Sequence, residues 1–134
     1  SHFGVFCAAD HPLGKLDRQI TGKDLQAYPW MYNTKAPAIT PHYPRLKESP
    51  GIVKNKLKIV AIDSLHMGKE LVINSHCLCH TPELAMAVEL HKGKVIKLNV
   101  PTKQISTDIM GLRHRDIRSP LLDQVFSLAA KCFS

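Results

Sequence analysis

The sequence has little negative charge, few aromatic side chains and no long hydrophobic run. No apolar stretch of the 134 residues approaches the roughly 18–20 residues that cross a bilayer, so we expect a soluble or peripheral protein. The four cysteines are sparse, which excludes the dense framework of small disulfide-stabilised secreted domains and favours a reducing compartment. With 44% hydrophobic residues, disorder along the whole chain is excluded too. The chain starts at Ser1 without a signal-peptide core, and we expect a processed or trimmed product.

The charge that is present is mostly positive. Lysine and arginine number 18 against 11 acidic residues, a net charge of +7, which predicts an anionic partner, nucleic acid first and a membrane surface second. Residues 92–118 alone carry seven positive and two negative side chains. Three of them are Arg113, Arg115 and Arg118, whose forked guanidinium groups suit bidentate phosphate binding. A merely solvated basic face is the alternative.

Composition divides the chain into two parts. Residues 1–51 hold six of the nine prolines and six of the eight aromatic residues. Because proline fixes φ and removes a backbone donor, we expect a largely irregular extension there, with Tyr28–Gly51 lying on a partner surface or acting as a loose linker. Residues 52–134 are expected to form the folded domain.

Within that domain, hydrophobic patterning predicts mainly strands. We expect strands at 56–62, 70–74 and 94–100, with a turn at 63–68. Residues 84–90 are ambiguous: Thr81-Pro82-Glu83 is a typical helix start and Lys92-Gly93 a typical helix stop, yet the apolar residues alternate, and we favour a strand. Ser119-Pro120 begins a predicted helix over 121–132.

Two clusters suggest chemistry without completing it. His76-Cys77-Leu78-Cys79-His80 crowds four metal-ligating side chains into five residues, too close for one backbone to wrap around zinc, so we favour buried core cysteines. His76 and Asp108 resemble the histidine and acidic members of picornaviral chymotrypsin-fold cysteine proteases. A nucleophile loop is absent, so an intact protease is excluded and only a detached first barrel remains.

A longer resemblance begins at Gln104. Gln104–Gly111, Arg115–Ser119 and Val125–Ala129 resemble, without a gap, the C-terminal segment of the universal large-subunit ribosomal protein fourteen family. Lys69–Ile73 and Lys92–Lys97 are similar to strands of that family. The departures, including Asp108 in place of an arginine, a lost middle segment and a foreign N-terminus, indicate a divergent organellar form, most simply a mitochondrial one.

This resemblance implies a small, partly eroded five-stranded β-barrel, a mainly β fold with a short C-terminal helix and the irregular N-terminal extension. It implies a structural constituent of the large ribosomal subunit in the mitochondrial matrix, bound to rRNA and neighbouring ribosomal proteins, with a small-subunit rRNA contact. Basic side chains would neutralise closely spaced phosphates. We expect nine such contacts: Lys54, Lys56, Lys58, Lys92, Lys94, Lys97, Arg113, Arg115 and Arg118.

Asp108 and Asp116 would orient neighbouring arginines. We expect no catalysis, metal, cofactor or membrane partner. The detached protease barrel and a basic adaptor that grips a protein through Tyr28–Tyr43 are the alternatives.

Overall fold

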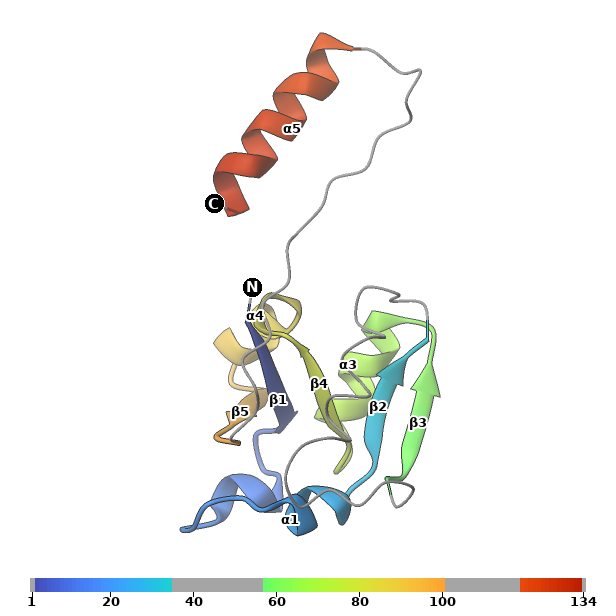
Figure 1. Cartoon of the computed structure of the whole chain (residues 1–134), viewed down its shortest axis with the longest axis vertical. Helices are drawn as coiled ribbons and strands as arrows, with labels where there is room; N and C mark the ends of the chain where they lie inside the picture. The colour runs from blue at the N-terminus through green and yellow to red at the C-terminus, as the bar shows by residue number, and fades with distance from the viewer. Residues whose placement is uncertain (1, 35–56, 101–118, 134) are drawn as a thin grey trace.

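The computed structural model describes residues 2–34, 57–100 and 119–133, and they form an open five-stranded sheet with helices (Figure 1). The strands lie in the order β3-β2-β4-β1-β5. In chain order the elements are β1 (Phe3–Ala8), the 3-10 helix η1 (Pro12–Lys15), α1 (Gly22–Gln26), β2 (Trp30–Asn33), β3 (Ile59–Ile62), α3 (Leu65–Ile73), β4 (Leu78–Pro82), α4 (Glu83–His91), β5 (Val95–Leu98) and α5 (Pro120–Phe133).

The sheet is mixed in direction. β2 pairs in parallel with β3 on one side and with β4 on the other. β1 is antiparallel to both of its neighbours, with Phe3 opposite Pro82 on β4 and Val5 opposite Leu98 on β5. The chain passes from β3 through α3 to β4, and this connection crosses over β2. A connection between parallel strands of this kind usually places a helix on one face of the sheet.

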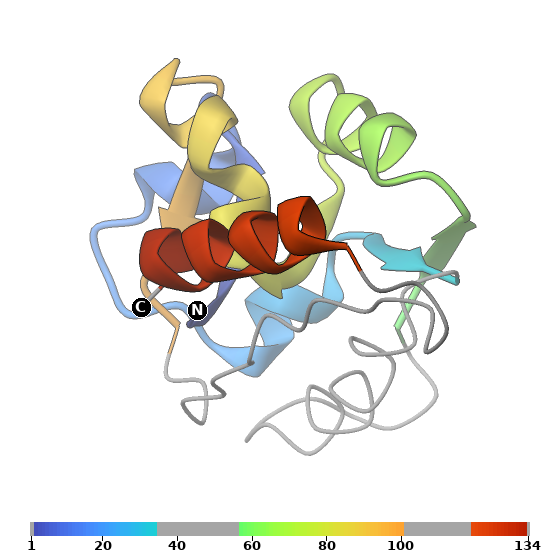
Figure 2. The ribbon, with the colours of Figure 1, turned by 90° about the horizontal axis from the view of Figure 1, so that it is seen from above.

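Both faces of the sheet are covered (Figure 2). On one face α3 and α4 contribute Val72 and Met86 to a core that includes Phe6 of β1. On the other face η1 and α1 contribute Leu13 and Leu25 to a second core. Because β1 is buried on both faces, Phe3–Ala8 is a continuous apolar run rather than an alternating one.

Local signals explain where α4 ends. Gly93 has a φ of +65°, and its N–H donates to the Leu90 carbonyl over 3.0 Å. The Lys94 N–H donates to the Glu89 carbonyl over 2.9 Å. Together these bonds form a Schellman motif, which satisfies carbonyls that the helix itself leaves without donors.

Replacing Gly93 with alanine should lower the free energy of unfolding by about 1–2 kcal/mol, because a Cβ disfavours the left-handed conformation. A Cβ at this position would meet no atom within 4 Å, so packing adds no cost. Asparagine tolerates this conformation better, and Gly93→Asn should cost less than Gly93→Ala. Urea denaturation followed by circular dichroism measures both values. Equal losses in the two variants would contradict the backbone explanation.

Several sequence predictions are confirmed. β3 and β5 lie within the ranges predicted for two strands, α5 covers the predicted helix with one more residue at each end, and the described residues form five strands. The barrel is wrong, because β3 and β5 are the two outer strands of the sheet that residues 2–34 and 57–100 form, and they do not pair with each other. The strands predicted at 70–74 and 84–90 are wrong as well: residues 70–73 belong to α3, Asn74 follows it, and residues 84–90 belong to α4.

The N-terminal extension also differs from the prediction. Residues 2–34 form β1, η1, α1 and β2, and β1 lies between β4 and β5. They were expected to be irregular because of their prolines, but Pro12 opens η1 and Pro29 directly precedes β2, positions that proline tolerates. The proposed domain boundary at residues 51 and 52 lies outside the described residues and stays a prediction.

α5 lies apart from the sheet in Figure 1, and its apolar residues Leu121, Val125 and Leu128 are exposed. Ser119 precedes it, as the sequence predicted for the helix start, and the Asp123 N–H donates to the Ser119 carbonyl. Among the described residues, no helix is long and apolar enough to cross a membrane.

Candidate functional site

The carboxyl ends of three parallel strands meet at one edge of the sheet. β2, β3 and β4 all end there, β1 starts there, and β5 ends there because it is antiparallel to β1. β3 and β4 flank β2 on opposite sides, so the chain changes its direction across the sheet at this point. In open α/β sheets, ligands bind in the crevice outside the carboxyl ends of the strands at such a position. We use the name carboxyl-end crevice for this edge, defined by the ends of β2, β3 and β4.

Two hydroxyl groups lie where β2 and β3 end. The Thr34 N–H donates to the Ile62 carbonyl over 2.7 Å, and the Thr34 hydroxyl donates to the same oxygen over 3.3 Å. Ser64 caps α3, with its Oγ accepting from the Met67 N–H over 3.4 Å. Gly68 allows the helix to approach closely, since a Cβ there would lie 3.0 Å from Cδ1 of Ile62. The start of α3 is therefore held against the end of β3.

The junction between β4 and α4 completes the crevice. Thr81 is buried, and Pro82 stands at the N-cap of α4 without a side-chain hydrogen bond. The Glu83 N–H donates to the His2 carbonyl over 2.9 Å, which ties α4 to the residue before β1. The Glu83 carboxylate pairs with the Lys97 ammonium over 2.7 Å and so joins α4 to β5.

These groups can bind a small polar molecule. They offer hydroxyls and the starts of two nine-residue helices, whose N–H groups favour negative charge. The buried cysteines do not add a nucleophile. Burial, together with Asp10, raises the pKa of Cys7 to about 12, and burial raises the pKa of Cys77 to about 11 and that of Cys79 further, so all three stay protonated thiols.

The basic residues predicted to bind phosphate are dispersed in the structure. Lys58 is exposed just before the edge strand β3, whereas Lys92, Lys94 and Lys97 are exposed near β5 at the opposite edge. The ammonium of Lys97 is already paired with Glu83. The other members of the predicted set lie outside the described residues: Lys54, Lys56, Arg113, Arg115 and Arg118. The four described lysines therefore do not make one basic face.

The cysteine and histidine cluster is divided between core and surface. Cys77 and Cys79 are buried in the core beneath α3 and α4, whereas His76 is exposed. The His80 ring packs against the Phe3 ring with centroids 5.1 Å apart. In the parts of the chain that the structure describes, no three His, Cys, Asp or Glu side chains gather as metal ligands. Asp108, the proposed partner of His76, lies outside those parts.

Sequence reasoning missed the carboxyl-end crevice. A signal was present at Ser64, because serine directly before an apolar helical stretch is a typical N-cap. We interpreted Asp63-Ser64 as part of a turn between two strands, since the residues after it also fit a strand. Thr34 and Thr81 carry no sequence signal of their own; only the parallel pairing of β2, β3 and β4 brings them to one edge.

Comparison with known proteins identifies a family. The model of the LysR substrate binding domain family matches residues 1–132. None of the curated proteins matches the sequence significantly. The ribosomal resemblance is therefore wrong, and with it the large-subunit role, the rRNA and ribosomal-protein partners and the mitochondrial location. The resemblance was local, and it rested on residues 104–129, most of which lie outside the described parts.

Solved structures share this fold. The regulatory domain of MetR from N. meningitidis is 20% identical, with a TM-score of 0.60 over 77% of this chain and 48% of that chain. The AmpR effector binding domain from Citrobacter freundii is 11% identical, with a TM-score of 0.67 over 98% of this chain and 63% of that chain. Full-length LysG from Corynebacterium glutamicum, solved with bound effector Arg, is 13% identical, with a TM-score of 0.55 over 77% of this chain and 34% of that chain. The chain thus spans between a third and two thirds of these structures.

Proposed function

Because the chain belongs to the LysR substrate binding domain family, we propose that it forms part of the effector-binding unit of a transcriptional regulator. The observation that carries this proposal is the carboxyl-end crevice, where β2, β3 and β4 end together and α3 and α4 begin. A small polar effector would lie there, with its acceptor groups toward the helix starts and the hydroxyls of Thr34 and Ser64.

The similar structures support this proposal. They are a regulatory domain, effector binding domains and a regulator with a bound effector. We propose that the present chain acts in the same way, by binding rather than by catalysis, and that DNA binding belongs to another part of the whole regulator. Effector binding would then change the regulator's affinity for its DNA site, since a ligand shifts an equilibrium by its difference in affinity for the two states.

A ligand screen tests this function. We would record the melting temperature of the chain with each of the twenty amino acids and a series of small mono- and dicarboxylic acids. A ligand at about 100 times its Kd stabilises the folded state by about 2.7 kcal/mol, which raises Tm by roughly 10 °C in a domain of this size. If none of these compounds raises Tm, the proposal that the crevice binds small polar effectors is wrong.

Replacing Ser64 with alanine should lower the affinity for a compound found in this screen about tenfold, because the hydroxyl at the crevice is lost. Thr21→Ala is the matched control, since Thr21 also caps a helix, α1, through a hydrogen bond from the Asp24 N–H. Each variant should lose about 1 kcal/mol of stability from its lost cap. Isothermal titration calorimetry separates them: only Ser64→Ala should change Kd, and equal Kd values would place the ligand elsewhere.

A further inference from the structure

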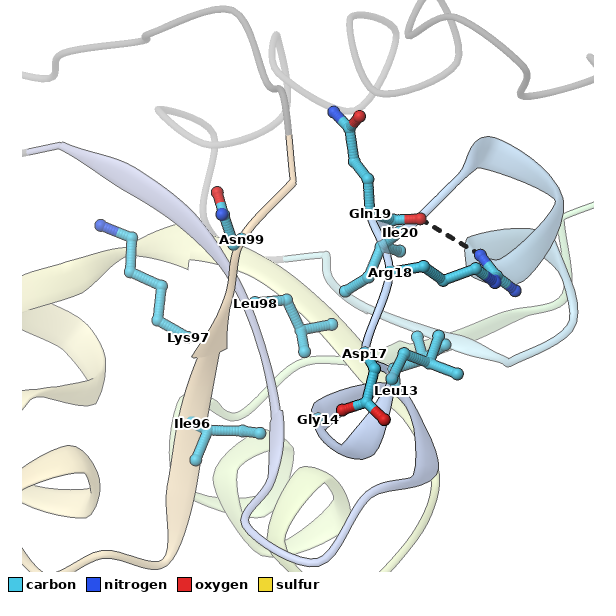
Figure 3. Close-up of a pocket in the computed structure, with 11 residues that line it drawn as sticks. Leu13, Gly14, Asp17, Arg18, Gln19, Ile20, Ile96, Lys97, Leu98 and Asn99 are labelled. Carbon is cyan, nitrogen blue, oxygen red and sulfur yellow. Dashed lines mark hydrogen bonds between the residues drawn. The ribbon is translucent and has the colours of Figure 1, made fainter.

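A cavity lies beside β5, at the edge of the sheet opposite to β3 (Figure 3). It has a volume of about 640 Å³ and lies between β5 and the segment Leu13–Ile20. This volume is in the range of small-molecule sites, roughly 300–1,000 Å³. We call it the β5 pocket.

The inner walls of the β5 pocket are apolar. Ile96 and Leu98 lie two positions apart on β5, and their side chains point toward the segment that carries Leu13 and Ile20. The side chain of Ile20 points back toward Leu98 (Figure 3). Since Leu13, Ile20 and Leu98 are buried members of one core cluster, they form a floor that holds its shape.

The two cations of the lining are already neutralised. The Arg18 guanidinium makes two hydrogen bonds of 2.7 Å to the Asp24 carboxylate and a third, of 3.1 Å, to the Gln19 carbonyl. The Lys97 ammonium points away from the pocket in Figure 3 and pairs with Glu83 over 2.7 Å. Neither charge is therefore left to hold an anion in the pocket.

The remaining charge is negative. Asp17 lies on the wall beside Gly14 (Figure 3), and in the described part of the chain no hydrogen bond or ion pair engages its carboxylate. The side-chain amides of Gln19 and Asn99 lie on the rim and can accept hydrogen bonds through their oxygens. The pocket thus combines an apolar floor with one available carboxylate.

The wall that carries Asp17 is fixed in place. The Asp24 carboxylate holds Arg18 and also accepts from the Thr21 N–H over 2.8 Å and from the Thr21 hydroxyl over 2.7 Å. These bonds anchor the residues that follow Asp17 to the start of α1. A ligand would therefore meet a wall whose backbone is held in place before binding, which lowers the entropic cost of ordering that wall.

We propose that the β5 pocket binds a small organic cation, a primary amine on an apolar chain, with the ammonium at Asp17 and the chain against Ile96, Leu98 and Ile20. This site is separate from the carboxyl-end crevice at Thr34 and Ser64, because β4 and β1 lie between β2 and β5. The domain would then bind a second ligand, a positively charged hydrogen-bond donor, in addition to an effector that presents acceptor groups.

Three probes of equal chain length test the charge preference: n-hexylamine, 1-hexanol and hexanoate. Each is titrated into the full chain while two-dimensional ¹H–¹⁵N spectra are recorded. Hexylamine should bind about three to five times more tightly than hexanol, the gain of one exposed ion pair, and hexanoate more weakly than either. The chemical-shift changes that hexylamine causes should lie at residues 13–20 and 96–99. Equal affinity for the amine and the alcohol, or shifts centred on Thr34 and Ser64, would overturn the proposal.

Variants test the role of Asp17. Asp17→Asn should bring the affinity for hexylamine down to that for hexanol, and Asn99→Asp should raise it about threefold by adding a second carboxylate at the rim. Asp10→Asn removes the same charge from an exposed position outside the pocket and should leave both affinities unchanged. If Asp17→Asn keeps the preference for the amine, the carboxylate is not the ligand's partner. None of these outcomes depends on an effector in the crevice, so the two proposals can fail separately.

Discussion

Replacing Trp30 with alanine should lower the free energy of unfolding by about 3–5 kcal/mol, a large part of the roughly 5–15 kcal/mol that stabilises a typical domain. Trp30 is 2% exposed in β2, and its indole N–H donates to the Leu25 carbonyl of α1 over 3.0 Å. Its ring thus holds α1 against one face of the sheet. Removal leaves a cavity and an unpaired carbonyl together.

A second variant separates these two effects. Trp30→Phe keeps most of the ring and removes the donor, so it should cost about 1–3 kcal/mol, the penalty of a buried acceptor left without a partner. Val88→Ala is the control, because Val88 is 55% exposed on α4 and should change stability by less than about 0.5 kcal/mol. Urea denaturation should be followed by far-ultraviolet circular dichroism, since Trp30 is the sole tryptophan. A loss below 1 kcal/mol in Trp30→Ala would contradict this packing.

Acid should destabilise the domain through His11. The ring is fully buried, Nδ1 accepts from the Leu13 N–H over 3.1 Å, and Nε2 lies 3.3 Å from the His76 carbonyl. Nδ1 therefore carries no proton, and Nε2 carries the proton that is donated to His76. Protonation of Nδ1 would place its N–H directly opposite the Leu13 N–H, and two donors would face each other.

The sign of the pH effect follows from the pKa. Burial lowers the pKa of His11 from its ordinary value of 6.5, and the nearby His76 ring lowers it too, although the His76 carbonyl and the Asp10 carboxylate act in the opposite direction. Between the lowered value and 6.5 the unfolded chain binds more protons, so stability falls as the pH drops below about 6.5 and levels off below the folded pKa. A single proton limits the slope to about 1.4 kcal/mol per pH unit.

His11→Asn isolates this effect. The asparagine oxygen can accept from the N–H two residues on, as in an Asx turn, so the start of η1 keeps its cap while the titrating group is removed. The variant should be less stable than the wild type at pH 7.5 but should show a shallower fall in stability toward pH 5. His66→Asn, at an exposed position of α3, should keep the wild-type slope. Urea denaturation at several pH values gives the slopes, and equal slopes in wild type and His11→Asn would refute the role of His11.

The errors of sequence reasoning have one physical origin. α3 and α4 each contain a short apolar run, and such a run fits a strand and a buried helix equally well when periodicity is the only evidence. Thr81-Pro82-Glu83 is a typical helix start and Lys92-Gly93 a typical helix stop, and both signals are correct for α4. The alternation of apolar residues between them favours a strand and is misleading. Helix signals at both ends were the better guide.

The candidate sites could not be found in the same way. Asp17 and Ile96 line the same pocket, and Thr34 at the end of β2 bonds to Ile62 at the end of β3, yet each pair is far apart in the chain. Strand pairing and packing bring such residues together. A local sequence pattern does not indicate which distant segment will be the partner. The positive charge suggested nucleic acid, whereas the four described lysines of the predicted set, Lys58, Lys92, Lys94 and Lys97, lie near two opposite edges of the sheet.

By itself the sequence determined the local features: the strands at Ile59–Ile62 and Val95–Leu98, the start of α5 after Ser119, the end of α4 at Gly93 and the low negative charge. These depend on side-chain alternation, capping and glycine conformation, which act within a few residues. Only the tertiary structure decided that β1 lies inside the sheet, that α3 is a helix, and that a lone carboxylate faces an apolar pocket at β5. The physical reason is that burial and strand pairing join distant residues, so their outcome is a property of the whole domain.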